Sequence, residues 1–232
     1  MNPEYRAEFV TDAWADTYVQ HTFGASHPDL VETYLGLTVP ILKVDLLRYL
    51  LLFSEGGVYC DLDVSCDTPF GEWIPPQYED ETNVVVGWEF NVGWPRPFVH
   101  QLAIWTIMAK PGSPHLWTVI EETVQWLKDE AKKNNVSVGE LTLDKIGDVV
   151  DITGPRRFTQ GVLRSLGRAF RTTEQDIQEI LESKLVGDVL VLPGYAFAAS
   201  ANHYDKDMKL SPPLVTHHYV GSWKNPKGGE AS

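Results

Sequence analysis

The sequence predicts a single α/β domain, spanning residues 1–232, in which helices flank a central mixed sheet. Residues 42–53 are apolar nearly all round, which is typical of a buried helix with one polar edge. Val84-Val85-Val86 is an unbroken apolar run, which is typical of a buried strand. At 232 residues the chain is long enough for a substantial core, and one domain is the favoured count.

The charge balance excludes one class of partner. The chain has 32 acidic against 19 basic residues and a formal net charge of −13, so we expect no nucleic-acid partner. An acidic enzyme can still bind a nucleoside diphosphate if a metal ion supplies the positive charge. Arg48 interrupts the longest apolar run, so we expect no membrane span in this chain.

The first half of the chain predicts three helices and a strand that ends in two carboxylates. Thr11-Asp12 caps an amphipathic helix, residues 28–37 form a second, and residues 42–53 form the third. Gly56-Gly57 ends that helix, because glycine tolerates positive φ at a helix C-terminus. The strand that starts at Val58 continues into Asp61-Leu62-Asp63.

Side chains alternate along a strand, so Asp61 and Asp63 would point to one side and form a pair of oxygen ligands. Hard divalent ions such as Mg²⁺ and Mn²⁺ prefer such ligands, completed by water and substrate phosphates. An Asp-x-Asp triplet by itself also fits a solvated turn. Cys60 and Cys66 allow one intramolecular pair. We expect a buried thiol at Cys60, with a disulfide as the alternative.

The second half of the chain alternates between strands and helices. The strand at residues 84–87 delivers Glu89 and Asn91 to its carboxyl end, where open α/β sheets bind ligands. Thr153-Gly154-Pro155 opens a later helix, and Arg156-Arg157 in its first turn opposes the helix dipole and requires a reason. The other expected elements are helices at 98–109, 113–133 and 172–185, a polar connection at 134–145, a strand at 188–192 and an extended segment at 214–224.

A family resemblance rests on residues at fixed spacing: Asp45-x-x-Arg48-Tyr49, then Gly56-Gly57-x-Tyr59-x-Asp61-x-Asp63. This pattern resembles the DXD sugar-binding region of glycosyltransferase family 32. The stretch LLRYLLLFSEGGVYCDLDVSCDTPF is most similar to fungal members related to the initiation-specific α-1,6-mannosyltransferases.

The resemblance implies a GT-A-like fold, a location in the Golgi lumen, and Mn²⁺ or Mg²⁺ as cofactor. It implies transfer from GDP-mannose, the favoured donor, to a glycan acceptor with retention of the α configuration. It also implies roles for individual residues. The implied catalytic residues are Asp61, Asp63 and Glu89. The implied metal ligands are Asp61, Asp63 and His217, with His218 in reserve. The implied donor contacts are Asp45, Arg48, Tyr49, Gly57, Tyr59, Asp61 and Trp223. The implied acceptor side is Trp88, Asn91, Gly154 and Pro155.

Three other functions fit parts of the pattern. One is a UDP-hexose-dependent transferase, and another is a catalytically silent glycan- or nucleotide-binding subunit of a transferase complex. The third is a glycoside hydrolase that uses Asp61 and Asp63 as acid and base. Hydrolysis requires two carboxyl groups on opposite sides of a glycosidic bond, and two positions so close on one strand do not provide that.

Family sequences have a strand upstream of the Asn-Pro-x-Tyr that stands here at Asn2 to Tyr5. We expect this strand to be missing, which would leave an exposed sheet edge, weak donor binding and self-association. The alternative is that another segment, such as residues 4–10, takes the place of that strand.

Overall fold

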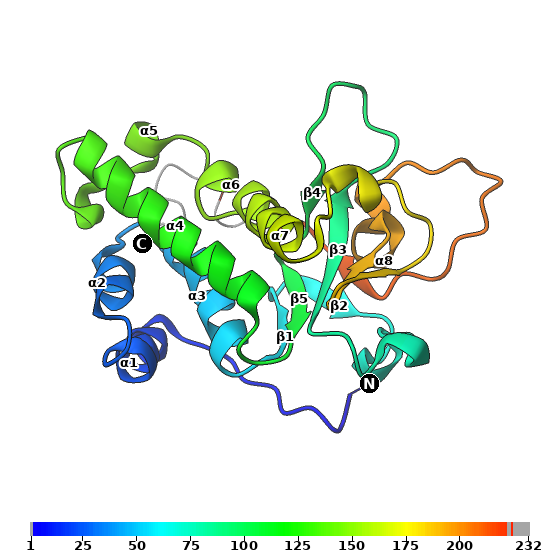
Figure 1. The fold of residues 1–232 in the computed structure, drawn as a ribbon, viewed down its shortest axis with the longest axis horizontal. Coiled ribbons are helices and arrows are strands. Elements are labelled where there is room, and N and C mark those ends of the chain that lie inside the picture. The colour runs from blue at the N-terminus through cyan, green and yellow to red at the C-terminus, as the bar shows by residue number, and fades with distance from the viewer. Residues whose placement is uncertain (1, 222–223, 225–232) are drawn as a thin grey trace.

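A mixed β-sheet forms the centre of the computed structural model, which describes residues 2–221 and 224 (Figure 1). The strand order is β1-β5-β3-β7-β6, and β4 pairs with β3 outside this path. The bounds are β1 (Gly57–Cys60), β3 (Val84–Phe90), β4 (Gln101–Leu102), β5 (Thr106–Ala109), β6 (Lys184–Val186) and β7 (Val189–Leu192). The predicted α/β class with a mixed sheet is confirmed.

Three of these strands run in the same direction, and this places their carboxyl ends at one edge of the sheet. β3 is parallel to β7, and β5 is antiparallel to both β1 and β3. Strand β1 therefore runs in the direction of β3. Asp61 follows the end of β1 and Glu89 lies near the end of β3, so the sheet brings both carboxylates to the same edge.

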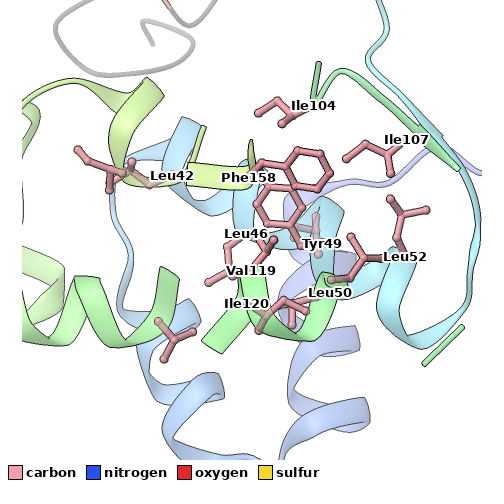
Figure 2. Packing of buried hydrophobic residues seen from close by; sticks show 14 of the residues in the cluster. Leu42, Leu46, Tyr49, Leu50, Leu52, Ile104, Ile107, Val119, Ile120 and Phe158 are labelled. Carbon is pink, nitrogen blue, oxygen red and sulfur yellow. The ribbon is translucent and has the colours of Figure 1, made fainter. Parts of the chain in front are cut away.

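Long helices cover one face of the sheet. They are α1 (Asp12–Phe23), α2 (Pro28–Gly36), α3 (Pro40–Ser54), α4 (Pro114–Lys133) and α7 (Pro155–Phe170). Strand side chains alternate between faces, so Val84 and Val86 join this core while Val85 joins the core on the opposite face. Figure 2 shows the helical core, where Tyr49 of α3 and Phe158 of α7 stack with ring centroids 5.4 Å apart.

The opposite face is covered by smaller pieces. Helix α8 (Gly194–Ala198) packs there with Trp73, and a second sheet of two antiparallel strands lies beside it, β2 (Val64–Cys66) and β8 (Val215–His217). The remaining short elements are α5 (Leu143–Ile146), α6 (Val149–Ile152), and the 3-10 helices η1 (Phe70–Glu72), η2 (Pro76–Tyr78), η3 (Val138–Glu140), η4 (Glu174–Asp176) and η5 (Ala199–Ala201).

The turn between α3 and β1 has the geometry that its two glycines predict. Gly56 and Gly57 adopt φ values of +69° and +91°. A Cβ on Gly56 would lie 2.8 Å from the carbonyl oxygen of Ala109, so a side chain there would be both strained and obstructed. The turn therefore requires glycine and fixes where β1 enters the sheet.

Residues 98–109 form strands β4 and β5, and the predicted helix there is wrong. A nearly continuous apolar run fits a buried strand as well as a buried helix, and periodicity alone does not separate them. The tertiary structure decides, because β5 lies between β1 and β3 and takes backbone partners from both. The following prediction is confirmed: α4 begins at Pro114, with Ser113 as its N-cap.

The predicted acidic helix at 172–185 is also wrong. Only η4 is helical, with a capping box between Thr173 and Asp176, and residues 184–186 form β6. Two contacts hold the segment between them in an irregular path. The carbonyl of Ile177 accepts from Trp88 Nε1 at 2.8 Å, and the amide of Glu179 donates to Asn91 Oδ1 at 2.7 Å.

Strand β1 pairs on one side only, with β5, within the described part of the chain. Residues 4–10 contain no strand and are exposed. Both cysteines are free thiols and half-buried. Among the described helices, we find none whose length and hydropathy would let it cross a membrane.

Candidate functional site

The two aspartates of the DXD triplet lie in a turn. Strand β1 ends at Cys60, the amide of Asp61 donates to the carbonyl of Trp105 at 2.9 Å, and the amide of Val64 donates to the carbonyl of Asp61 at 3.2 Å. Leu62 at the tip of this turn is 90% exposed. The prediction that the strand continues through Asp63 is therefore wrong, and side-chain contacts rather than strand alternation set the directions of the two carboxylates.

Arg48 holds the carboxylate of Asp61. Its Nη1 donates to Asp61 Oδ1 at 3.1 Å and to the carbonyl of Ile104 at 3.1 Å. The hydroxyl of Tyr59 donates to the same carboxylate oxygen at 2.8 Å, and its ring lies 4.8 Å from the guanidinium carbon. Both side-chain bonds engage Oδ1, which leaves Oδ2 as the candidate ligand atom of Asp61.

Asp45 anchors Arg48 from behind. Arg48 Nη2 donates to Asp45 Oδ1 at 2.7 Å, and Thr153 Oγ1 donates to Asp45 Oδ2 at 2.8 Å. Asp45 and Arg48 are only 1% and 2% exposed. Burial raises the pKa of Asp45 to about 6, although Arg48 and Thr153 oppose this shift. Burial acts to lower the pKa of Arg48, but the neighbouring carboxylates and tyrosines raise it, so the guanidinium stays charged.

This burial places two of the predicted donor contacts inside the protein. Asp45 uses both carboxylate oxygens inside the protein, and Tyr49 is fully buried with its hydroxyl on the carbonyl of Thr153 at 2.8 Å. Neither side chain reaches the surface, so both act through Arg48 and the start of α7. Gly57 lies at the opposite end of β1 from the acidic turn. Trp223 lies outside the described residues.

Strand β8 brings His217 to the acidic turn. It pairs with β2 in a register that sets His217 opposite Val64, and His217 Nε2 lies 3.3 Å from Asp63 Oδ2. The neighbouring His218 turns away, and its Nε2 lies 2.6 Å from Ser65 Oγ. The imidazole of His217 stacks on Trp105 with ring centroids 4.5 Å apart.

The environment favours a neutral imidazole at His217. Burial lowers its pKa, while Asp63 and Asp61 raise it to a smaller extent. The backbone also holds Asp63, since the amide of Val220 donates to its Oδ2 at 2.9 Å and the amide of His218 donates to its carbonyl at 2.9 Å. The segment after β8 therefore closes over the acidic turn.

Glu89 lies at the same edge of the sheet, near the end of β3, and is 9% exposed. Its Oε2 accepts from Gln101 Nε2 at 2.9 Å, and its carbonyl accepts from Asn202 Nδ2 at 2.8 Å. Burial raises its pKa, and Gln101 and Trp105 oppose the shift. Trp105 also stacks on the imidazole of His217.

The four predicted acceptor-side residues lie in two places, near the end of β3 and at the start of α7. Trp88 and Asn91 are fully buried. Trp88 Nε1 and Asn91 Oδ1 bond the loop at residues 177–179, so these two side chains support that loop. Gly154 is buried and Pro155 half-buried at the start of α7, directly after the Thr153 that bonds Asp45. Their effect on the site is therefore indirect in this structure.

Sequence reasoning missed Trp105, Gln101 and Asn202. Trp105 fell in a segment predicted as helix, so its position beside the turn was hidden. Asn202 bonds the amides of Asn91 and Val92 as well as the carbonyl of Glu89, and so fixes the end of β3. A lone asparagine in a loop gives no signal of such a role.

The site offers carboxylate oxygens and one imidazole nitrogen, a donor set that suits a divalent cation. Asp61 Oδ2, Asp63 Oδ2 and His217 Nε2 are the candidate atoms. His217 Nδ1 is buried with no hydrogen-bond partner in the described part of the protein. Across residues 2–221 and 224, no three His, Cys, Asp or Glu side chains are already gathered as a complete metal centre. The residues fit a site that substrate phosphate and water would complete.

Comparison with known proteins identifies relatives. Residues 1–80 match the family described as "Glycosyltransferase sugar-binding region containing DXD motif". The chain is 30% identical over 97% of its length to an initiation-specific alpha-1,6-mannosyltransferase of Schizosaccharomyces pombe, covering 57% of that protein. It is 28% identical to the protein of the same name from Candida albicans, with 97% of this chain and 64% of that protein covered.

A third relative is a putative glycosyltransferase of Saccharomyces cerevisiae, which is 27% identical over 97% of this chain and 59% of that protein. The chain thus spans about three fifths of the length of the curated relatives it matches. A solved structure titled "PaToxG Glycosyltransferase" aligns with 65% of this chain and 40% of that chain at 19% identity and a TM-score of 0.33.

Proposed function

We propose that the protein is a metal-dependent glycosyltransferase, because it resembles glycosyltransferase family 32 in a DXD-containing sugar-binding region. The observation that carries the proposal is the contact between Asp63 and His217, which come from distant segments of the chain, at the turn that also contains Asp61. A binding subunit without activity would not require a neutral imidazole and two oriented carboxylates at one sheet edge.

The proposed reaction transfers mannose from GDP-mannose to a glycan hydroxyl with retention of the α configuration. The support for mannose is that the two most similar relatives named above are called alpha-1,6-mannosyltransferases. Arg48 and Tyr59 remain the candidate donor-side residues, and both bond Asp61. Trp223 stays a predicted donor contact.

Mn²⁺ or Mg²⁺ is the proposed cofactor, held by Asp61, Asp63 and His217. When bound, such an ion would act as a Lewis acid that neutralises the charge of the departing diphosphate, an effect worth several kcal/mol. The protein itself supplies orientation. Arg48 and Tyr59 fix Asp61, and the amide of Val220 with β8 fixes Asp63 and His217.

Glu89 is the proposed third catalytic carboxylate. Gln101 and Asn202 hold it at the edge where β1 and β3 end, and burial keeps its pKa raised. A carboxylate with a raised pKa is suited to accept a hydrogen bond from an acceptor hydroxyl and take its proton during transfer. We assign no nucleophile.

One experiment tests the proposed function directly. The chain is heated with each of several nucleoside diphosphate sugars, with Mn²⁺ and again with EDTA, and the melting temperature is measured. A ligand at a hundred times its Kd stabilises the folded state by about 2.7 kcal/mol. We expect GDP-mannose with Mn²⁺ to raise the melting temperature. In a transfer assay on the same protein, we expect EDTA to abolish mannose transfer. Undiminished transfer in metal-free buffer would falsify the metal-dependent mechanism, and a preference for UDP-sugars would replace the donor.

Two further parts of the proposal concern the setting of the enzyme. We propose the Golgi lumen as its location, as the family resemblance implies. We also propose that the chain self-associates, because the unpaired edge of β1 presents backbone groups that a second copy can pair with. Sedimentation over a concentration series tests this: a monomer at all concentrations excludes pairing through that edge.

A further inference from the structure

Helix α7 concentrates positive charge in an acidic protein. Four arginines, Arg156, Arg157, Arg164 and Arg168, lie on α7, and Arg171 is its C-cap. These are five of the chain's 19 basic residues, while no Asp or Glu occurs between residues 155 and 171. The chain as a whole has 32 acidic residues, so this helix is a local reversal of charge.

Four of these five arginines share one face of the helix. Phe158, Val162 and Leu166 point into the core, as Figure 2 shows for Phe158. Residues three, four and seven apart lie on one face of a helix. Four of the arginines follow this spacing and form what we call the arginine face: Arg157, Arg164, Arg168 and Arg171. Figure 1 shows α7 beside α4 on one outer side of the molecule.

Acidic neighbours neutralise only part of this charge. Glu122 of α4 pairs with Arg164 and also lies 3.9 Å from Arg168, so one carboxylate serves two guanidinium groups. Asp151 pairs with Arg156 at 3.0 Å. The side chain of Arg168 is 71% exposed. The arginine face therefore keeps an excess of positive charge.

The excess positive charge also affects Arg157. Its guanidinium lies over the ring of Trp126 at 5.6 Å, and its Nε donates to the carbonyl of Ile152 at 3.2 Å. Burial and the charge of Arg164 lower the pKa of Arg157. Two arginines that repel each other on one helix face gain from an external anion, and this supplies the reason for a first-turn arginine that opposes the helix dipole.

We propose that the arginine face binds the anionic lipid headgroups of a membrane surface. The four arginines span 15 residues, a length of about 20 Å along a helix, and lie in a line. A single phosphate requires guanidinium groups that converge on one point, whereas a line of charges matches a plane of repeated phosphates. The acidic remainder of the surface is repelled by the same lipids, so the contact orients the protein.

Vesicle sedimentation tests the proposal on the full chain. Vesicles of phosphatidylcholine alone are compared with vesicles that also contain phosphatidylserine, at low and high salt. The test variant is Arg168→Gln with Arg171→Asn, because Asn tolerates the positive φ of 56° at position 171. The matched control is Lys206→Gln with Lys209→Gln, two exposed lysines in an irregular loop, which removes the same charge.

We expect binding only to phosphatidylserine vesicles, lost at high salt, and an affinity for the test variant about 25-fold lower at an unchanged melting temperature. This figure converts about 1 kcal/mol per basic side chain near an anionic surface. Equal loss in the lysine control would show that net charge rather than the arginine face drives binding, and would overturn the proposal. So would the absence of vesicle binding together with tight binding of inorganic phosphate, which would identify a single-anion site.

Discussion

The imidazole Nε2 of His217 lies 3.3 Å from the carboxylate Oδ2 of Asp63. The pairing of β8 with β2 creates this contact, since it sets His217 opposite the residue that follows Asp63. A histidine near the C-terminal end of the described chain thereby reaches the carboxylate turn that follows the first strand of the sheet. The adjacent histidines therefore have different partners: His217 contacts Asp63, and His218 contacts Ser65.

We predict that His217→Gln lowers Mn²⁺ affinity at least tenfold, because it replaces the only proposed nitrogen ligand, while His218→Gln leaves the affinity within about twofold. The second histidine bonds Ser65 on the opposite side of β8. Calorimetric titration of Mn²⁺ in the presence of GDP measures both values. Equal effects of the two substitutions would exclude His217 as a specific ligand.

The two aspartates of the turn are predicted to differ in stability though not in activity. Asp61→Asn and Asp63→Asn should each reduce transfer about a hundredfold or more, because each removes a charged ligand from a Lewis-acid site. Asp63→Asn should leave the melting temperature unchanged. Asp61→Asn should cost about 1 kcal/mol, since Arg48 and Tyr59 keep their acceptor but lose its charge. Full activity in either variant would remove that residue from the proposed metal site.

Asp45→Ala is predicted to destabilise the fold by about 3–5 kcal/mol, because it leaves the buried guanidinium of Arg48 without its closest partner. Asp29→Ala is the control, since Asp29 pairs with Lys128 at the surface and its loss should cost at most about 1 kcal/mol. Urea unfolding measures both. A stable Asp45→Ala protein that has lost only its choice of donor sugar would return Asp45 to a direct role in donor binding.

Glu89→Gln is predicted to separate stability from activity. Burial raises the pKa of Glu89 in the folded state above its ordinary value, so the folded protein binds this proton more tightly than the unfolded chain does. The free energy of unfolding contributed by Glu89 therefore falls as pH rises from about the ordinary carboxyl value through the raised one. The glutamine variant keeps a partner for Gln101 and has no charge to bury.

We expect this variant to match the wild type in melting temperature at pH 4 and to exceed it at pH 7.5, while mannose transfer falls. Thermal melts of both proteins across that range measure the difference. A variant that is less stable at pH 7.5 would show that the ionised carboxylate is stabilised by partners, and full transfer activity would remove Glu89 from the catalytic group.

The sequence determined much of the first eighty residues. Glycines at Gly56 and Gly57 predicted the positive φ values that end α3, and the spacing of Asp45, Arg48 and Asp61 carried the family resemblance. The sequence also predicted helix Pro114–Lys133 to within one residue, and it predicted the strand at 84–87, which the structure extends to Phe90. Each of these signals is local: a backbone conformation that only glycine tolerates, a periodic apolar pattern, or a cap.

Only the tertiary structure decided which side chains face the site. Periodicity could not show that residues 106–109 are a strand, because β5 exists through its two neighbours in the sheet. Periodicity also could not show that Asp45 is buried behind Arg48, since an acidic residue on a helix gives the same sequence pattern whether its partner is the protein or a sugar. The contact between Asp63 and His217 depends on strand pairing between distant segments, a long-range interaction that no local pattern contains.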